Sequence, residues 1–206
     1  MNPDSIYEIL EFVEHKTELR TVCKQWNQTI MPFVSELKMN TEITDNKFKE
    51  ITRQYPNLKK IDCSYCRNLS TESISELGNV KEFKCRDCRF TSLNSLKSVE
   101  KIDCFGCYKL TTEGISKLNV KGFTCCYCNF ISLNSLKSAE FIDCSQCYNL
   151  TTEGISELGH VKTFICLDCK FTSLNCLKSA ECIYCHGCDN LSEEGISELK
   201  NVKIKK

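Results

Sequence analysis

Apolar residues recur along most of this chain in a fixed frame. In seven segments an apolar residue is followed three positions later by another, two positions later by a cysteine, and three positions later by a second cysteine. The first cysteines of these C-x-x-C pairs are Cys63, Cys85, Cys104, Cys125, Cys144, Cys166 and Cys185, so the gaps are 22, 19, 21, 19, 22 and 19 residues. This periodicity predicts a solenoid in which long and short repeats alternate.

The frame resembles that of the leucine-rich repeat, L-x-x-L-x-L-x-x-N/C, with cysteine at both the third leucine and the Asn/Cys position. The resemblance covers residues 34 to 204 and implies an α/β solenoid, with parallel β-strands on the concave face and short helices and turns on the convex face. An earlier repeat without cysteines fits Val34, Leu37, Met39, Ile43, Phe48 and Ile51, and Val202-Lys-Ile204 forms half a strand. We therefore expect about eight parallel strands.

The two repeat types differ after the second cysteine. The long type, as in residues 110–118, resembles the cysteine-containing subclass of leucine-rich repeats, and Thr111 is placed to cap a short helix whose Ile115 and Leu118 face inward. The short type, as in residues 130–136, has too few residues for a helix, so we expect a turn or a single 3₁₀ turn there.

The paired cysteines follow the repeat period, which favours two internal columns of packed thiols. Two neighbouring pairs would also supply the four sulfurs of a structural zinc site, but they are evenly spaced instead of grouped in fours. Disulfides between repeats and redox chemistry are further alternatives. Disulfides conflict with a reducing compartment. Redox chemistry needs a helix N-terminus beside the cysteine pair, and this frame places none there. We predict no metal and no cofactor.

Charge and composition narrow the function classes. Lys plus Arg and Asp plus Glu are 27 each, so the chain has no general attraction for nucleic acid or for an anionic membrane. No apolar run is long enough to span a bilayer, and the first residues lack a basic start followed by an apolar core, so we expect no signal peptide. We expect a protein of the cytoplasm or nucleus. The three histidines lie in unrelated segments and no Gly-rich phosphate loop is present, so an enzyme is not expected.

Residues 1 to 33 break the repeat pattern. Ile6, Ile9, Leu10 and Val13 have the spacing of an amphipathic helix that begins near Pro3 and Asp4, and a second helix carries Leu19, Val22, Cys23 and Trp26. Pro3-Asp4 with Ile9-Leu10, and Val22-Cys23-Lys24-Gln25-Trp26, resemble the opening and the V-C-K-x-W signature of the F-box. No leucine precedes Pro3, and the link between the helices is shorter than in the family. The alternative is a plain helical cap over the first repeat.

The F-box resemblance implies a substrate-recognition subunit of a cullin–RING ubiquitin ligase. Such a subunit performs no chemistry and raises the local concentration of its substrate at the transfer site. Residues implied to contact the Skp-type adaptor are Pro3, Ile6, Ile9, Leu10, Leu19, Val22, Cys23 and Trp26. The alternative is a stand-alone leucine-rich repeat scaffold or inhibitor without a ligase link.

The repeats would hold the protein substrate. Strand residues beside the inward positions face the concave surface. Early repeats place charges there, whereas later ones place apolar and aromatic residues, which indicates a partner site. The candidate partner-binding residues are Phe105, Tyr127, Phe141, Ile165, Leu167, Tyr184 and His186, with scattered surface hydrophobes as the alternative interpretation.

Overall fold

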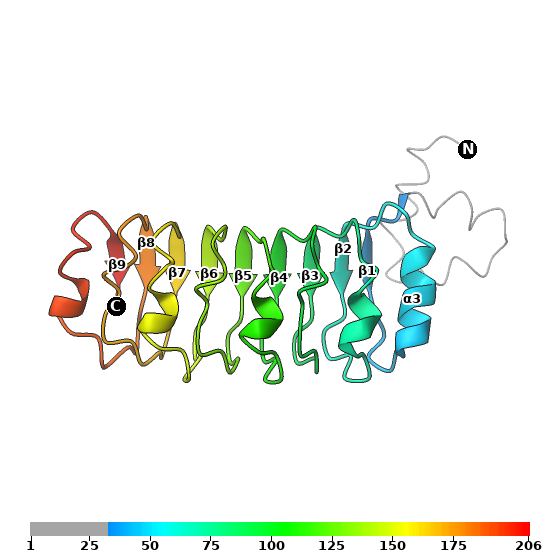
Figure 1. Cartoon of the computed structure of the whole chain (residues 1–206), viewed down its shortest axis with the longest axis horizontal. Helices are drawn as coiled ribbons and strands as arrows, with labels where there is room; N and C mark the ends of the chain where they lie inside the picture. Colours follow the sequence, from blue (N-terminus) through cyan, green and yellow to red (C-terminus); the bar gives the residue numbers. More distant parts are fainter. Residues whose placement is uncertain (1–32) are drawn as a thin grey trace.

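A computed structural model describes residues 33–206, drawn in colour in Figure 1. Every residue expected to contact an adaptor lies outside the described residues, namely Pro3, Ile6, Ile9, Leu10, Leu19, Val22, Cys23 and Trp26. The structure therefore bears on the predicted repeat domain, residues 34–206, and the division of the chain at residue 33 stays a prediction from sequence.

Nine three-residue strands form one parallel sheet in the described part of the chain, side by side in chain order. They are β1 (Glu36–Lys38), β2 (Lys60–Asp62), β3 (Glu82–Lys84), β4 (Lys101–Asp103), β5 (Gly122–Thr124), β6 (Phe141–Asp143), β7 (Thr163–Ile165), β8 (Cys182–Tyr184) and β9 (Lys203–Lys205). The predicted solenoid is confirmed. The expected number of strands is wrong, because the C-terminal segment pairs with β8 over its whole length instead of forming half a strand.

Alternation along each strand separates a buried face of the sheet from an open one. The middle residue of β1 to β8 is buried, and its two neighbours in the strand point to the opposite face. Figure 1 shows the helical segments in front of the row of strands, so they cover the side on which the middle residues lie. We call the other side the open face; it carries the first and third residue of each strand.

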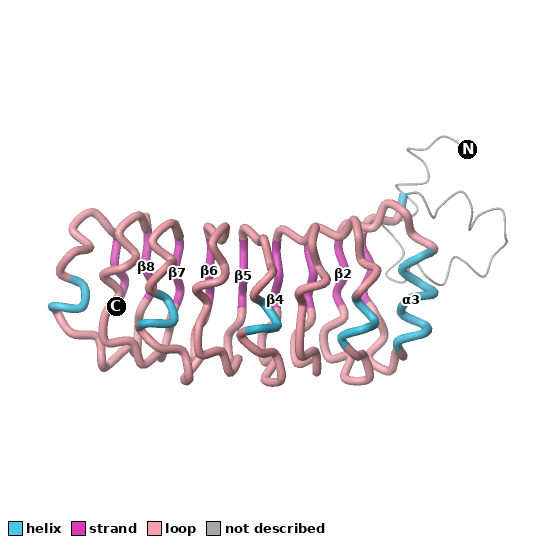
Figure 2. Tube along the Cα trace, viewed as in Figure 1, coloured by secondary structure: helices cyan, strands magenta, loops and turns pink. Residues whose placement is uncertain are grey.

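Helical structure follows β1 and β2 in the first two repeats and then occurs only in alternate repeats, as Figure 2 shows. The segments are α3 (Asp45–Arg53), η3 (Thr71–Ile74), η4 (Glu113–Ile115), η5 (Glu153–Ile155) and η6 (Glu194–Ile196), of which the last four are 3₁₀ turns. The predicted cap is present, since the Thr111 hydroxyl accepts a hydrogen bond from the Gly114 amide at 3.0 Å. Short repeats contain no helix, as predicted from their length.

Phenylalanine fills the space that the missing helix leaves in each short repeat. The strand residue Phe123 packs against Phe130 with ring centroids 6.1 Å apart, and both are fully buried. The same pair recurs as Phe83–Phe90 and Phe164–Phe171, also at 6.1 Å. Long repeats carry isoleucine at the same strand position, with an isoleucine from their 3₁₀ segment and a leucine three residues after it. Repeats of unequal length thus both fill the core behind their strands with buried apolar side chains.

Each short repeat is bonded to the long repeat that follows it. The Asn134 side chain donates to the Glu153 carbonyl at 2.8 Å and accepts from the Glu157 amide at 3.0 Å, so it spans η5. Gly154 lies where the turns touch, and a Cβ there would be 2.2 Å from the Ile131 carbonyl oxygen. Asn94 with Gly114 and Asn175 with Gly195 repeat this contact. A side chain is therefore excluded at these glycines.

Candidate protein-binding face

The C-x-x-C pairs form two columns of buried thiols. The first cysteines are 0 to 3% exposed and the second cysteines 0 to 8%. Each second thiol after the first pair donates to the backbone carbonyl of the first cysteine in the preceding repeat. Cys107 Sγ lies 2.8 Å from the Cys85 oxygen and Cys147 Sγ lies 2.9 Å from the Cys125 oxygen. The six such distances run from 2.8 to 3.3 Å. The predicted thiol columns are confirmed, and the second thiol ties neighbouring repeats together.

The spacing within each pair comes from a turn. The residue before the second cysteine has a φ between +52° and +73° in all seven pairs, at Tyr65, Asp87, Gly106, Tyr127, Gln146, Asp168 and Gly187. Only two of these are glycine, and a Cβ at Gly106 would lie 2.6 Å from Asp87 Oδ1. The pairs thus mark the point where the chain leaves a strand and turns, which explains their even spacing without a bound metal.

Burial also sets the acidity of the thiols. It raises the pKa of Cys63, Cys85, Cys104, Cys125 and Cys144 well above the ordinary thiol value, and raises the pKa of Cys66 to about 12. A hydrogen bond from the first cysteine of the preceding repeat lowers the pKa of Cys88, Cys147 and Cys188, the last to about 7. Because thiolate is the reactive and metal-binding form, the first column serves as packing at neutral pH.

No group of three or more His, Cys, Asp or Glu side chains within residues 33–206 is placed to hold a metal ion. The seventeen cysteines of this region all carry free thiols. Two histidines belong to it: His160 hydrogen-bonds the Leu136 carbonyl at 3.3 Å, and His186 follows β8. Over the same residues, no helix has the length and apolarity that crossing a membrane requires.

Charges alternate in sign over the first half of the open face. The first strand positions of β1 to β4 carry Glu36, Lys60, Glu82 and Lys101, and the third positions carry Lys38, Asp62, Lys84 and Asp103. Lys60 Nζ lies 3.2 Å from Glu36 and 3.5 Å from Glu82, and Lys101 Nζ lies 3.7 Å from Glu82. These eight residues form what we call the charge lattice. It is electrically balanced, so it offers no general attraction for a polyanion.

Three stacked side chains follow the lattice along the turns after β3, β4 and β5. The Arg86 guanidinium is bonded to Asp103 at 2.7 Å and lies 5.9 Å from the centroid of the Phe105 ring. Phe105 in turn packs on Tyr127, with centroids 5.1 Å apart. Tyr127 is 47% exposed. The structure thus brings two of the predicted partner-binding residues together and adds Arg86 to them.

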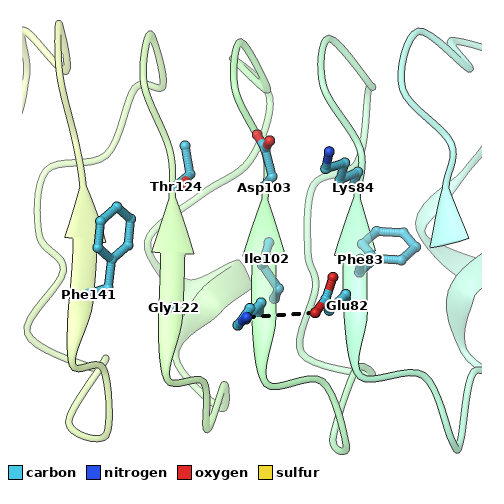
Figure 3. Close-up of a pocket in the computed structure, with 9 residues that line it drawn as sticks. Glu82, Phe83, Lys84, Ile102, Asp103, Gly122, Thr124 and Phe141 are labelled. Atoms are coloured by element: carbon cyan, nitrogen blue, oxygen red, sulfur yellow. Dashed lines mark ion pairs between the residues drawn. The ribbon is translucent and has the colours of Figure 1, made fainter. Parts of the chain in front are cut away.

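A hollow of about 210 Å³ opens on the face over β5. Gly122 and Thr124 line its middle, Phe141 stands on one side, and Lys101 and Asp103 stand on the other. Gly122 pairs with Lys101 on β4 and with Phe141 on β6, so the three lie in one row across the strands. Figure 3 shows the Phe141 ring on the strand beside Gly122, and Glu82, which is ion-paired with Lys101, on the other side of it.

The remaining predicted residues continue the face toward the C-terminal end. Ile165 pairs in register with Tyr184, whose ring lies 4.5 Å from Lys205 Nζ and whose hydroxyl accepts from the same ammonium at 3.2 Å. Leu167 is 37% exposed, and His186 occupies the same turn position in the next repeat. These four residues belong to β7, β8 and the turns after them. Phe105 and Tyr127 follow β4 and β5, so the seven residues form a band rather than one cluster.

The sequence analysis did not identify the hollow, because it selected exposed apolar side chains. The hollow forms where Gly122 has no side chain. Comparing the first strand position across repeats would have found it. Eight of the nine strands have a side chain there, and only Gly122 of β5 has none.

Sheet, register and repeat frame together define a leucine-rich repeat solenoid. Similar solved structures include a leucine-rich repeat protein of Leptospira interrogans (TM-score 0.62, 17% identity, covering 83% of this chain and 47% of that one). Internalin C2 of Listeria monocytogenes gives 0.61, 15%, 86% and 84%, and the leucine-rich repeat domain of the type III effector XopL gives 0.56, 14%, 94% and 83%.

At these identities the likeness shows the fold alone. This chain spans about half the length of the Leptospira protein. No family model and no curated protein matches the sequence. The open face of this fold is where the chain presents aromatic side chains.

Proposed function

We propose that this chain is the substrate receptor of a cullin–RING ubiquitin ligase. It binds a Skp-type adaptor through residues 1–33 and a protein substrate through the open face. The observation that carries the protein-binding part is the exposed apolar band on that face, where Phe105 packs on Tyr127 and Phe141 borders a hollow. Exposed aromatic side chains of this kind supply the anchoring contacts in protein interfaces.

The ligase link is supported by the F-box resemblance of residues 2–27. In this function the chain catalyses nothing itself. It holds its substrate near the ubiquitin-transfer site and so turns an intermolecular encounter into a local one. Buried, protonated thiols in the first column and an ion-paired lattice on the open face agree with a binding role.

Native mass spectrometry of the full chain mixed with a purified Skp-type adaptor tests the link. We expect a one-to-one complex for the wild type, and at least tenfold weaker association for Val22→Asp, which puts a charge on the predicted adaptor-binding helix. Asn27→Ala, on the same segment, serves as the matched control and should bind like the wild type. Circular dichroism verifies that the repeat domain of each variant stays folded.

The alternative is a free-standing repeat scaffold or inhibitor. It is favoured by one observation: residues 33–206 build a nine-stranded sheet with a continuous core of their own. A wild-type chain that stays unbound at micromolar adaptor would reject the ligase role and leave this alternative.

A further inference from the structure

We infer that the hollow over Gly122 receives an aromatic side chain of a partner protein, next to a partner carboxylate that pairs with Lys84. This inference deepens the protein-binding part of the proposed function and rests on it, while it is independent of the ligase link. It starts from the residue that makes the hollow.

Gly122 is not required by the fold. Its backbone lies outside the left-handed region, and a Cβ added to it would meet only Lys101 Cγ, at an ordinary 3.5 Å. In contrast, Gly106 has a φ of +68°, and a Cβ at Gly114 would lie 2.2 Å from a backbone oxygen. A glycine inside a strand weakens the strand, and where nothing local demands it, close approach of another molecule is a recognised reason for it.

The walls of the hollow select an apolar ring. Phe141 is 37% exposed and offers its ring from β6, directly across from Gly122. Thr124 adds a methyl group, and the stem of Lys101 borders the opposite side. A volume of about 210 Å³ exceeds the roughly 150 Å³ in which a protein cavity holds benzene. An inserted ring would pack on the bare Gly122 backbone and against Phe141, which favours an aromatic over an aliphatic side chain.

The charge that the hollow leaves unpaired is positive. Glu82 is shared between Lys60 and Lys101, and the Asp103 carboxylate is held by Arg86. No ion pair within the described residues involves Lys84, which lines the same hollow from β3. A carboxylate beside the inserted ring would therefore find an ammonium without an ion pair, whereas a partner cation would find both carboxylates that line the hollow already paired.

A competing explanation is that Phe141 simply covers the glycine, as aromatic residues do in other sheets. The two explanations predict opposite effects of filling the hollow. In Gly122→Val the added side chain occupies the binding space and restores a residue that favours strands. We expect its melting temperature to be about 2 to 4 °C above that of the wild type, and binding to be lost.

The probe is the capped dipeptide N-acetyl-Asp-Trp-amide, titrated into the ¹⁵N-labelled full chain while the Gly122 amide resonance is followed. We expect a saturating shift with a dissociation constant on the order of 1 mM, as suits a ligand of this size. N-acetyl-Asp-Ala-amide should not saturate, and N-acetyl-Asn-Trp-amide should bind about threefold more weakly. Lys84→Gln should remove that difference between Asp and Asn while keeping the response to Trp.

Absence of a Trp-dependent shift at Gly122 in the folded wild type overturns the inference, as does a melting temperature that falls in Gly122→Val. An Asp–Asn difference that persists in Lys84→Gln overturns the assignment of the carboxylate. These results are separable from the ligase test. A chain that binds the dipeptide but ignores the adaptor is a stand-alone binder, and a chain with the opposite behaviour holds its substrate elsewhere.

Discussion

Raising the pH should unfold this protein at a lower alkalinity than most, because its thiols are protonated only while they are buried. The pKa of Cys63, Cys85, Cys104, Cys125 and Cys144 is raised by burial. In the unfolded chain these thiols ionise near pH 8.5. The folded state therefore binds more protons above that pH. The stabilisation is complete below about pH 8.5 and declines as the pH rises toward the folded-state pKa.

The magnitude follows from the number of thiols. Each group that is ionised only in the unfolded state lowers the free energy of unfolding by about 1.4 kcal/mol per pH unit. The five fully buried thiols alone give about 7 kcal/mol by pH 9.5 and about 14 kcal/mol by pH 10.5. A domain with a typical stability of about 5 to 15 kcal/mol should thus unfold within this interval. The pKa of Cys88, Cys147 and Cys188 is lowered instead, by a hydrogen bond from a neighbouring cysteine, so these thiols do not add to the loss of stability at high pH.

Urea denaturation followed by circular dichroism, in reducing buffer at half-unit steps from pH 7.5 to 10, measures this slope. The variant Cys144→Ala should be less stable at pH 7.5, because it loses buried volume, yet its slope above pH 9 should be smaller by about 1.4 kcal/mol per pH unit. A free energy of unfolding that changes by less than about 1 kcal/mol between pH 8 and 9.5 would show that the thiols are not buried as described.

Three further substitutions test the repeat packing by their effect on the urea midpoint. Gly154→Ala should cost about 1 to 3 kcal/mol because its Cβ would meet backbone, whereas Gly78→Ala, with nothing within 4 Å, should be neutral or slightly stabilising; equal effects would contradict the close contact. Asn134→Ala should cost about 1 to 3 kcal/mol through its two lost hydrogen bonds to η5, and a neutral result would mean that the turn is held otherwise. Phe130→Ala should cost about 3 to 5 kcal/mol, but Ile131→Ala, at a side chain 64% exposed, under about 0.5 kcal/mol; the reverse order would misplace the core.

Which residues are inside could be predicted from the sequence, because burial follows the repeat period directly. The apolar frame places Ile61 and its equivalents in the strands, and both cysteine columns in the core. What the period does not encode is how one repeat bonds to the next. The Asn134 side chain bonds to backbone groups about 20 residues away, on both sides of η5. These bonds depend on the exact course of two turns, which the repeat period does not determine.

The candidate site was predictable only in part for a related reason. Phe105 and Tyr127 were found because large apolar side chains beside inward positions stand out in the sequence. Their stacking depends on how the turns of neighbouring repeats align, and the hollow at Gly122 depends on which residues share a row across the strands. The C-terminal segment was expected to form only half a strand, and its pairing with β8 over three residues shows a complete edge strand.

In a repeat protein, the equivalent positions of the other repeats show which residue a position would be expected to have. The charge lattice alternates through four strands, so a fifth strand that continued it would bear an acidic residue first and a basic residue third. β5 has Gly122 and Thr124 instead, and Phe141 follows at the first position of β6. Cross-strand ion pairs are lost at this point, and an aromatic ring is exposed at the same place. A glycine inside a strand weakens the strand. The partner contact inferred above, at the middle of the open face, would account for both changes.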